Sequence, residues 1–330
     1  MTEKLASRPL PTSTSTSVPD AADRRGAVTV WAAVGVLWMV FVGQAWGRWL
    51  FSDREFRPAP ILGPDQFSGT LLVVLRAIEV VSIGIAAATI WVFLIGPVLR
   101  ERRLRLDGMI VIGGLIAVAI DPLINYFHYT FAWNAHAFNM GSWLAYFPHE
   151  SGPTHYGEGL AWALPQYLYL GIGFAAIECR IILALRRRFP TISNVRAFGA
   201  ASLCIFGVDV VIEQLFVRTQ VYGYPRTWSE LTLFAGTQYQ FPIYESIFVA
   251  VYAAGFTALR MSAHDDPDGV SFVERGAHRL SPRIQLPVRL SAVIGFCGVW
   301  AALAYFVPWS WMSVNADSLV RLPSFLQAGG

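Results

Sequence analysis

Charged residues are scarce in this chain, at 14% of its 330 positions, whereas hydrophobic residues make up 55%. A soluble domain of this length needs far more charge on its surface, so the composition excludes one and indicates the membrane class. The net charge of +3 could suggest an anionic partner, but the basic residues lie in short clusters between apolar runs. Such clusters are typical of loops that set the orientation of membrane spans.

Cysteine is also rare. The three present, Cys179, Cys204 and Cys297, lie in apolar segments, are odd in number and have no metal-like spacing. We expect them to be reduced packing residues.

The motifs that hold metals and nucleotides are missing. No HxxxH or HExxH motif occurs, and His264 and His278 fall in an expected cytoplasmic loop. There is no G-x-G-x-x-G or Walker loop, no G-x-S-x-G elbow and no basic-aromatic stretch for nucleic acid. We therefore expect no metal, no other cofactor and no nucleic-acid partner.

Seven stretches are apolar and long enough for helices that cross a bilayer, each of which needs about 20 residues. The third contains Asp121-Pro122 and the fifth contains two acids, so six spans are the alternative. We expect a disordered tail over residues 1–26, a transmembrane helical domain over 27–313 and a C-terminal tail over 314–330. The predicted fold is an all-α membrane bundle with spans near 28–51, 69–99, 108–127, 160–185, 197–217, 241–261 and 288–312.

The placement of arginine predicts the orientation of this bundle. Arginine clusters follow the second and fourth spans and precede the seventh, whereas residues 126–160 contain no Lys or Arg. Basic clusters in short loops stay on the cytoplasmic side. We expect a multi-pass protein of the inner (plasma) membrane, with its N-terminus in the cytoplasm and its C-terminus outside.

Six carboxylates interrupt the apolar spans. An ionisable group facing hydrocarbon is costly, so such residues usually face a cavity, a partner or a pathway. The predicted orientation places five of them in the outer half of the bilayer and Glu178 near the cytoplasmic arginines. The six are Glu79, Asp121, Glu178, Asp209, Glu213 and Glu245.

Asp209 and Glu213 are four residues apart, so they share one face of a helix. Two carboxylates on one desolvated face cannot both ionise cheaply, so one is expected to keep its proton beside a charged partner, as acid-base catalysis requires. The alternative is structural, with one acid bonded to Arg218 and the other capping a neighbouring helix. Asn125 follows Asp121 by four residues, and Pro122 between them frees a backbone carbonyl near an expected cavity.

The other acids have structural alternatives of their own. Glu79 follows Arg76 by three residues, which favours an ion pair at least as much as a catalytic role. Glu178 is expected to pair with Arg180 or with the arginines at 186–188. Glu245 follows Pro242 at the mouth of the sixth span, where catalysis and solvation are both open.

Residues Tyr126–Trp162 contain eleven aromatic side chains together with histidines and asparagines. The segment is too polar to span a membrane, so we expect an extracytoplasmic cap between the third and fourth helices, with rings at headgroup depth. Such a cap would cover a pocket; the alternative is an aromatic belt without a ligand.

Two strings in this region, Asp121-Pro-Leu-Ile-Asn-Tyr126 and Phe138-Asn-Met-Gly-Ser-Trp143, are similar to those of the AveC-like spirocyclases of polyketide pathways. The likeness also includes the Arg-Glu-Arg-Arg turn after the second span and the aromatic fourth span. The resemblance implies stereocontrolled closure of a dihydroxy-ketone to a spiroketal, with or without dehydration. It does not by itself assign a catalytic residue.

Paired carboxylates suit this chemistry, because one can protonate a departing hydroxyl while another stabilises the oxocarbenium ion or accepts a proton. Our hypothesis makes one member of the Asp209/Glu213 pair the acid, and Asp121 the base or charge stabiliser, with a hydrophobic polyketide-like substrate. A cofactor-free terpenoid cyclase and a non-enzymatic transporter or lipid-binding protein are the alternatives. The expected catalytic residues are Asp121, Asp209, Glu213 and Glu245, and the expected substrate-binding residues are Glu79, Asn125, Tyr126, His136, Asn139 and Trp143.

Overall fold

The computed structural model describes residues 26–52 and 54–329. The expected disordered tail lies, except for Gly26, outside the described residues. The described chain is mainly helical, and seven of its helical segments are long and apolar enough to cross a membrane, which confirms the seven-span prediction over the six-span alternative. These segments are Ala27–Leu50, Gly69–Glu101, Leu106–Asn125, Ala163–Arg188, Asn194–Arg218, Ile243–Asp265 and Pro282–Val314.

Three of the segments are single helices: α1 (Ala27–Leu50), α7 (Asn194–Arg218) and α8 (Ile243–Asp265). In three others a π-helical turn joins two α-helices, and in the remaining one a 3-10 segment continues an α-helix. The pieces are α2 (Gly69–Ile90) with α3 (Gly96–Glu101), α4 (Leu106–Ala117) with a 3-10 segment (Val118–Asn125), α5 (Ala163–Leu168) with α6 (Phe174–Arg188), and α9 (Pro282–Ala301) with α10 (Val307–Val314).

Local chemistry accounts for where these helices begin and change. Ser68 and Ser193 precede α2 and α7, and their hydroxyls accept hydrogen bonds from the first-turn N–H groups of Leu71 and Arg196. Pro122 has no N–H to donate, and it lies inside the 3-10 segment that follows α4. The backbone therefore leaves the regular α-helix close to Asp121.

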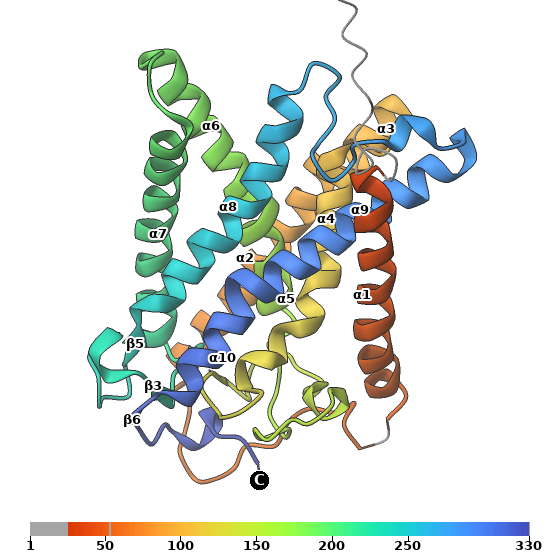
Figure 1. Cartoon of the computed structure of the whole chain (residues 1–330). Helices are drawn as coiled ribbons and strands as arrows, with labels where there is room; N and C mark the ends of the chain where they lie inside the picture. The colour runs from red at the N-terminus through yellow and green to blue at the C-terminus, as the bar shows by residue number, and fades with distance from the viewer. Residues whose placement is uncertain (1–25, 53, 330) are drawn as a thin grey trace, which may run out of the picture.

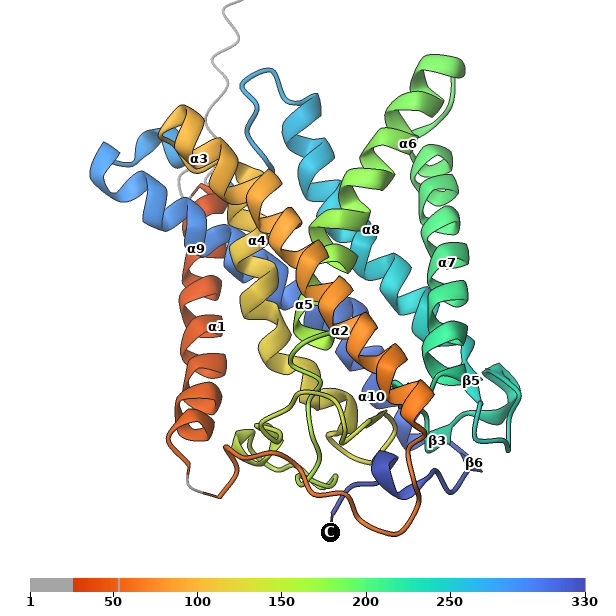
Figure 2. The same cartoon turned by 180° about the vertical axis from the view of Figure 1, so that it is seen from behind.

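Small residues allow a close crossing of two helices in the bundle. α1 packs along α9, and α4 also contacts α9. Gly35 of α1 and Gly295 of α9 face each other, and a Cβ on either would overlap the backbone of the other helix. On the opposite side of the molecule, α7 packs against α6 and α8 (Figure 1 and Figure 2).

Most long connections gather at one end of the bundle, drawn at the bottom of Figures 1 and 2. Residues 126–162 lie there beside the connection from α1 to α2 and the C-terminal residues. Three two-stranded antiparallel sheets tie these segments to the helix ends. They pair β1 (Ala132–Trp133) with β2 (Tyr222–Gly223), β3 (Arg226–Thr227) with β6 (Ser318–Leu319), and β4 (Thr232–Leu233) with β5 (Phe241–Pro242).

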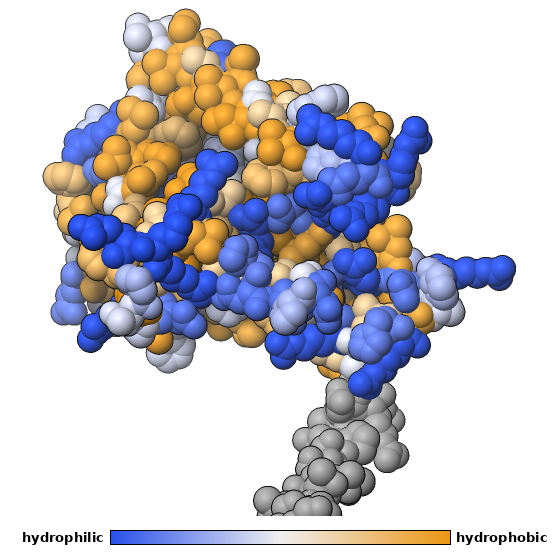
Figure 3. Space-filling model, turned by 90° about the horizontal axis from the view of Figure 1, so that it is seen from above, coloured by the Kyte–Doolittle hydropathy of each residue, from blue (hydrophilic) through white to orange (hydrophobic). Residues whose placement is uncertain are grey.

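The opposite end of the bundle carries the arginine clusters. Figure 3 looks onto this end and shows hydrophilic side chains spread across it. α3 and α6 end here and α9 begins here (Figure 1), which brings the clusters at 100–105, 186–188 and 275–289 to one side of the bundle. The chain is thus built as a multi-pass membrane protein with one strongly basic end.

Candidate active site

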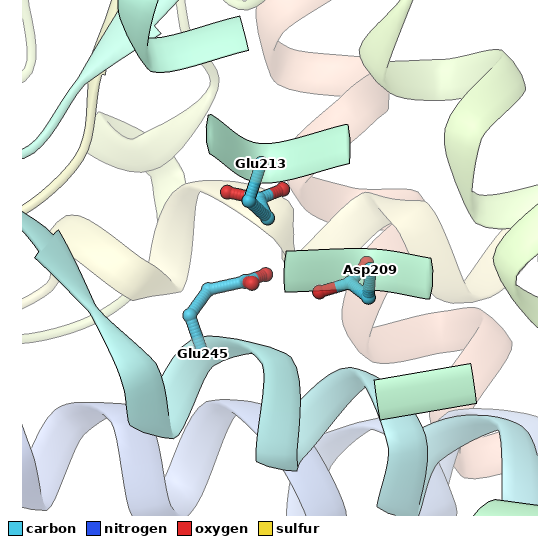
Figure 4. Close-up of side chains that lie close together, drawn as sticks. All are labelled: Asp209, Glu213 and Glu245. Carbon is cyan, nitrogen blue, oxygen red and sulfur yellow. The ribbon is translucent and has the colours of Figure 1, made fainter. Parts of the chain in front are cut away.

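Three carboxylates meet between α7 and α8. Asp209 and Glu213 lie one turn apart on α7, and Glu245 lies in the first turn of α8. One oxygen from each lies within 4.8 Å of the others, and all three residues are buried. Figure 4 shows the three side chains pointing toward one another. We refer to Asp209, Glu213 and Glu245 as the carboxylate triad.

Two tyrosines donate hydrogen bonds to the triad. Tyr224, just after β2, donates to Oε2 of Glu213 at 2.6 Å, and Tyr305, in the turn between α9 and α10, donates to Oε1 of Glu245 at 3.0 Å. Burial and the adjacent Glu213 raise the pKa of Tyr224 well above its usual range, so this phenol stays a donor. Both oxygens of Asp209 lack a hydrogen-bond partner.

Basic side chains do not neutralise the triad. Within residues 26–52 and 54–329, no Lys, Arg or His is paired with any of its three members. Arg218, the alternative partner considered from the sequence, lies instead over the rings of Phe234 and Tyr239, at 4.5 and 4.7 Å from their centroids. The triad is therefore a concentration of carboxyl groups without a protein counter-charge.

Asp121 belongs to a second carboxyl pair, with Glu158 of the 126–162 segment. Tyr167 of α5 donates a hydrogen bond to Asp121, and Ser142 donates one to Oε1 of Glu158 at 3.0 Å. Glu158 is 2% exposed, and its other oxygen has no partner apart from the neighbouring Asp121 group. Burial, and then the charge of Asp121, raise the pKa of Glu158 well above its usual range.

A central cavity of about 40 Å³ separates the two groups of carboxyls. Asp121 lines one part of its wall, and Glu213 and Glu245 line another. A space of this size holds about one water molecule, whereas a site for a small organic ligand takes roughly 300–1,000 Å³. The rest of the wall is mostly aromatic, with Phe131, Trp133, Trp162, Tyr167, Tyr222, Tyr252 and Tyr305.

A comparison with protein families bears on the whole of this region. The family model described as "Spirocyclase AveC-like" matches residues 101–326, which is more than half of the chain. The chain belongs to the AveC-like spirocyclase family. The residues matched by this spirocyclase family include Asp121, Glu158 and the carboxylate triad. All carboxyl groups that line the central cavity therefore lie within the matched range. No curated protein and no solved structure matches the chain.

The asparagines expected to bind substrate in this AveC-like chain are instead bonded to backbone. Oδ1 of Asn125 accepts from the N–H groups of Thr130 and Phe131, each at 2.9 Å. Oδ1 of Asn139 accepts from the N–H of Ala59 at 2.8 Å, and its Nδ2 donates to Ala137. Neither residue lines the central cavity. The polar atoms of both asparagines are hydrogen-bonded to backbone groups, so these side chains fix the shape of the loops around the cavity.

Tyr126 and Trp143, also expected to bind substrate, are likewise hydrogen-bonded to backbone groups. Tyr126 donates to the carbonyl of Pro148 at 2.5 Å, and Trp143 Nε1 donates to the carbonyl of Ala119 at 2.5 Å. These bonds fasten the 126–162 segment to itself and to the end of the third span.

Glu79 and His136 lie at another contact between this segment and α2. The predicted ion pair between Arg76 and Glu79 is confirmed, with Nη1 and Oε2 2.5 Å apart. The other oxygen of Glu79 accepts from the N–H of Phe138 at 2.6 Å, and Arg76 donates to the carbonyl of His136 at 2.7 Å. The ring of His136 stacks on Phe67. This arrangement anchors the loop and keeps Glu79 outside the cavity wall.

The prediction that Glu178 pairs with an arginine is wrong. Glu178 is buried and accepts hydrogen bonds from Thr257 and Ser202, whereas Arg186 pairs with Asp265. Hydroxyl groups on α7 and α8 replace the arginine because Glu178 faces the bundle interior. Cys179 and Cys297 are free and buried as expected, but Cys204 is exposed on the outer surface of the helices, which corrects its predicted packing role.

Several residues of the site were missed in the sequence. Glu158 follows Gly157 in an irregular segment, where no helical spacing connects it to Asp121. Tyr224 and Tyr305 come from segments before α8 and after α9. A signal for Glu158 was available, since it is an acid within an aromatic segment that has no Lys or Arg to pair with it.

Proposed function

We propose that this protein is a membrane-embedded spirocyclase that closes a dihydroxy-ketone polyketide to a spiroketal. Membership of the AveC-like family supports a spirocyclase-type reaction. The observation that carries the proposal is that Asp121, Glu213 and Glu245 line one buried, aromatic cavity. A site of this kind offers carboxyl groups to a reacting centre from more than one direction.

The reaction needs a proton donor and a proton acceptor but no net oxidation. One hydroxyl adds to the ketone to give a hemiketal, whose own hydroxyl is protonated and leaves as water. The resulting oxocarbenium ion is attacked by the second hydroxyl, which loses its proton as the spiroketal forms. The balance is one dihydroxy-ketone to one spiroketal and one water.

We assign the proton donor to the Asp121–Glu158 pair. Glu158 retains a proton because burial and Asp121 raise its pKa, and Asp121 lies between it and the cavity. This assignment differs from the hypothesis drawn from the sequence, in which Asp121 was the base or a charge stabiliser and the acid was one member of the Asp209/Glu213 pair. The carboxylate triad then supplies negative charge beside the oxocarbenium ion and accepts the proton of the attacking hydroxyl.

The aromatic wall has two uses in this scheme. It excludes water, which would otherwise capture the oxocarbenium ion, and its ring faces attract positive charge. A preorganised wall also holds the flexible substrate in one folded form, which sets the new stereocentre. Because the cavity now measures about 40 Å³, binding of a polyketide requires the surrounding helices or loops to move apart.

For the location, we propose the plasma membrane, with the arginine-rich end and the N-terminus in the cytoplasm. The cavity then lies in the outer half of the bilayer. A hydrophobic substrate dissolved in the membrane would reach it without crossing a polar surface.

The proposed activity is tested with purified protein in detergent and a synthetic dihydroxy-ketone. We expect faster closure and a different ratio of product diastereomers from the spontaneous reaction. Equal ratios with and without protein would end the proposal. A prenylated substrate without a ketone serves as a second probe, and its cyclisation would favour a terpenoid cyclase.

Substitution in the cavity wall tests the roles. Asp121→Asn and Glu245→Gln should each lower kcat at least about 100-fold, because each removes a positioned proton donor or acceptor. Glu178→Gln is the matched control: it changes an equally buried carboxyl that is outside the cavity. Turnover that falls equally in all three variants would indicate a general effect on folding and contradict the assigned roles.

A further inference from the structure

The charge of the carboxylate triad is not balanced by the protein. Of its carboxylate oxygens, three have no hydrogen-bond partner: both of Asp209 and Oε2 of Glu245. Asp209 is 0% exposed and Glu245 is 3% exposed. Buried charge without a partner is strongly unfavourable, above all inside a membrane span. The triad therefore requires positive charge, supplied either by shared protons or by an ion from outside the chain.

Two hydroxyl groups beside the triad point to the same need. Tyr222 and Ser246 are buried, and neither hydroxyl has a hydrogen-bond partner. The Tyr222 hydroxyl is directed at Glu213 and the Ser246 hydroxyl at Asp209, but neither reaches regular hydrogen-bond geometry. These groups are not acids, so their free oxygens are an observation separate from the clustering of carboxylates. Uncommitted buried polar groups are rare in folded proteins and usually have a ligand.

The donor set and its spacing select the kind of ligand. One oxygen from each carboxylate lies within 4.8 Å of the other two, which allows all three to contact one ion. The set contains only oxygen, the ligand atom that Mg²⁺ and Ca²⁺ prefer, and it lacks the nitrogen or sulfur typical of zinc and copper sites. The adjoining cavity of about 40 Å³ has room for water, which can supply further oxygen ligands.

We propose that Asp209, Glu213 and Glu245 bind one divalent cation of the Mg²⁺ or Ca²⁺ class. With all three carboxylates ionised around it, the bound ion leaves a net charge of −1, and it links α7 to the first turn of α8. The triad also takes part in the proposed reaction, but binding of the cation does not require substrate or turnover. If the proposed function also holds, a substrate hydroxyl that contacts the ion would lose its proton more easily.

The experiment measures Mn²⁺ binding, because this ion replaces both Mg²⁺ and Ca²⁺ and its signal in electron paramagnetic resonance falls when it binds. Chelator-treated, full-length protein in detergent should bind one Mn²⁺ per chain. Mg²⁺ and Ca²⁺ should displace it, and the ion that does so at the lower concentration is the preferred one. Binding should weaken as the pH falls, since protons compete for the carboxylates.

Variants locate the ion. Asp209→Asn and Glu245→Gln should each weaken Mn²⁺ binding at least about 100-fold. Loss of a residue that only hydrogen-bonds to a metal ligand weakens binding about 10–100-fold, and loss of the ligand itself should cost more. Glu178→Gln should bind as the wild type does, because the hydroxyls of Thr257 and Ser202 already occupy that carboxylate. Mn²⁺ should also raise the melting temperature of the wild type and of Glu178→Gln, but not that of Asp209→Asn.

Two results would overturn the proposal. One is the lack of a stoichiometric Mn²⁺ site in the wild type. Protons shared among the three carboxyl groups would then reduce the charge of the triad. The other is unchanged binding in both triad variants. Because binding is measured without substrate, the cation site and the spirocyclase activity can fail separately.

Discussion

At the residue scale, the position of each acid in the fold separates two roles that the sequence presented alike. Glu79 and Glu178 are buried, but protein donors occupy their oxygens. Asp209 has no such donors, and Glu158 keeps one oxygen free of all but Asp121. A carboxyl whose hydrogen bonds are already made stabilises the fold, whereas one without them is available to a proton, an ion or a substrate.

Glu158 should make the stability of the protein depend on pH. Its folded-state pKa is raised above the usual 4.5, so its contribution is complete below pH 4.5. It is lost at about 1.4 kcal/mol per pH unit as the pH rises toward the folded-state value. Glu158→Gln removes this loss. The melting temperature of the variant should therefore rise relative to the wild type between pH 5 and pH 8, in unfolding followed by fluorescence.

The exposed Glu230 provides the control for this titration. Glu230→Gln should follow the wild-type melting temperature across the same range. A difference between Glu158→Gln and the wild type that is constant with pH would show that Glu158 does not carry the buried proton.

At the element scale, glycines and one ion pair determine how the helices meet each other and the loops. α1 contacts α9 through Gly35 and Gly295, with no room for a side chain. The contact between α2 and residues 136–138 depends on Arg76 and Glu79, which satisfy backbone groups of the loop. A single substitution at either place should disturb the assembly of the bundle.

Gly295→Val should destabilise the protein by about 1–3 kcal/mol or more, because the added side chain must push α1 away from α9. Gly43 on α1 is the matched control, since a Cβ there meets no atom within 4 Å. Gly43→Ala should keep or slightly raise the melting temperature, as alanine favours a helix. Equal losses at both positions would contradict the close crossing.

Glu79→Ala should cost about 1–3 kcal/mol, because Arg76 loses its ion-pair partner and the partly buried N–H of Phe138 loses its acceptor. The measurement is thermal unfolding in detergent, combined with limited proteolysis of the 126–162 segment. Glu101→Ala removes an exposed ion-pair partner of Arg105 and should change little. Unchanged proteolysis in Glu79→Ala would contradict an anchoring role.

At the scale of the whole molecule, the bundle has two different ends. One carries the arginine clusters, and the other carries the long connections and the small sheets (Figure 1). Charge in short loops sets the orientation of such a bundle in the membrane. The basic end should therefore remain in the cytoplasm.

Cysteine labelling tests this orientation. In a background without Cys179, Cys204 and Cys297, we place single cysteines at Arg103, in the basic end, and at Gln238, in the loop between β4 and β5. A membrane-impermeant maleimide should label Gln238→Cys in intact cells and Arg103→Cys only after lysis. The reverse pattern would place the cavity in the cytoplasmic half of the bilayer.

The number, order and approximate ends of the spans follow from the sequence alone. Helix formation in a bilayer depends on the length of each apolar run, and the preferred side of each loop depends on its arginines, so both are local properties. The pairing of Arg76 with Glu79 and the shared face of Asp209 and Glu213 were predictable for the same reason, because a helix fixes residues three or four apart.

Only the tertiary structure determined which acids share the cavity. Tyr305 reaches Glu245 across 60 positions of the chain, and Tyr167 reaches Asp121 across 46. The loop that carries Glu158 has no regular period that would place it against Asp121. Contacts of this kind depend on how helices pack and loops fold back, so residue spacing along the chain does not encode them.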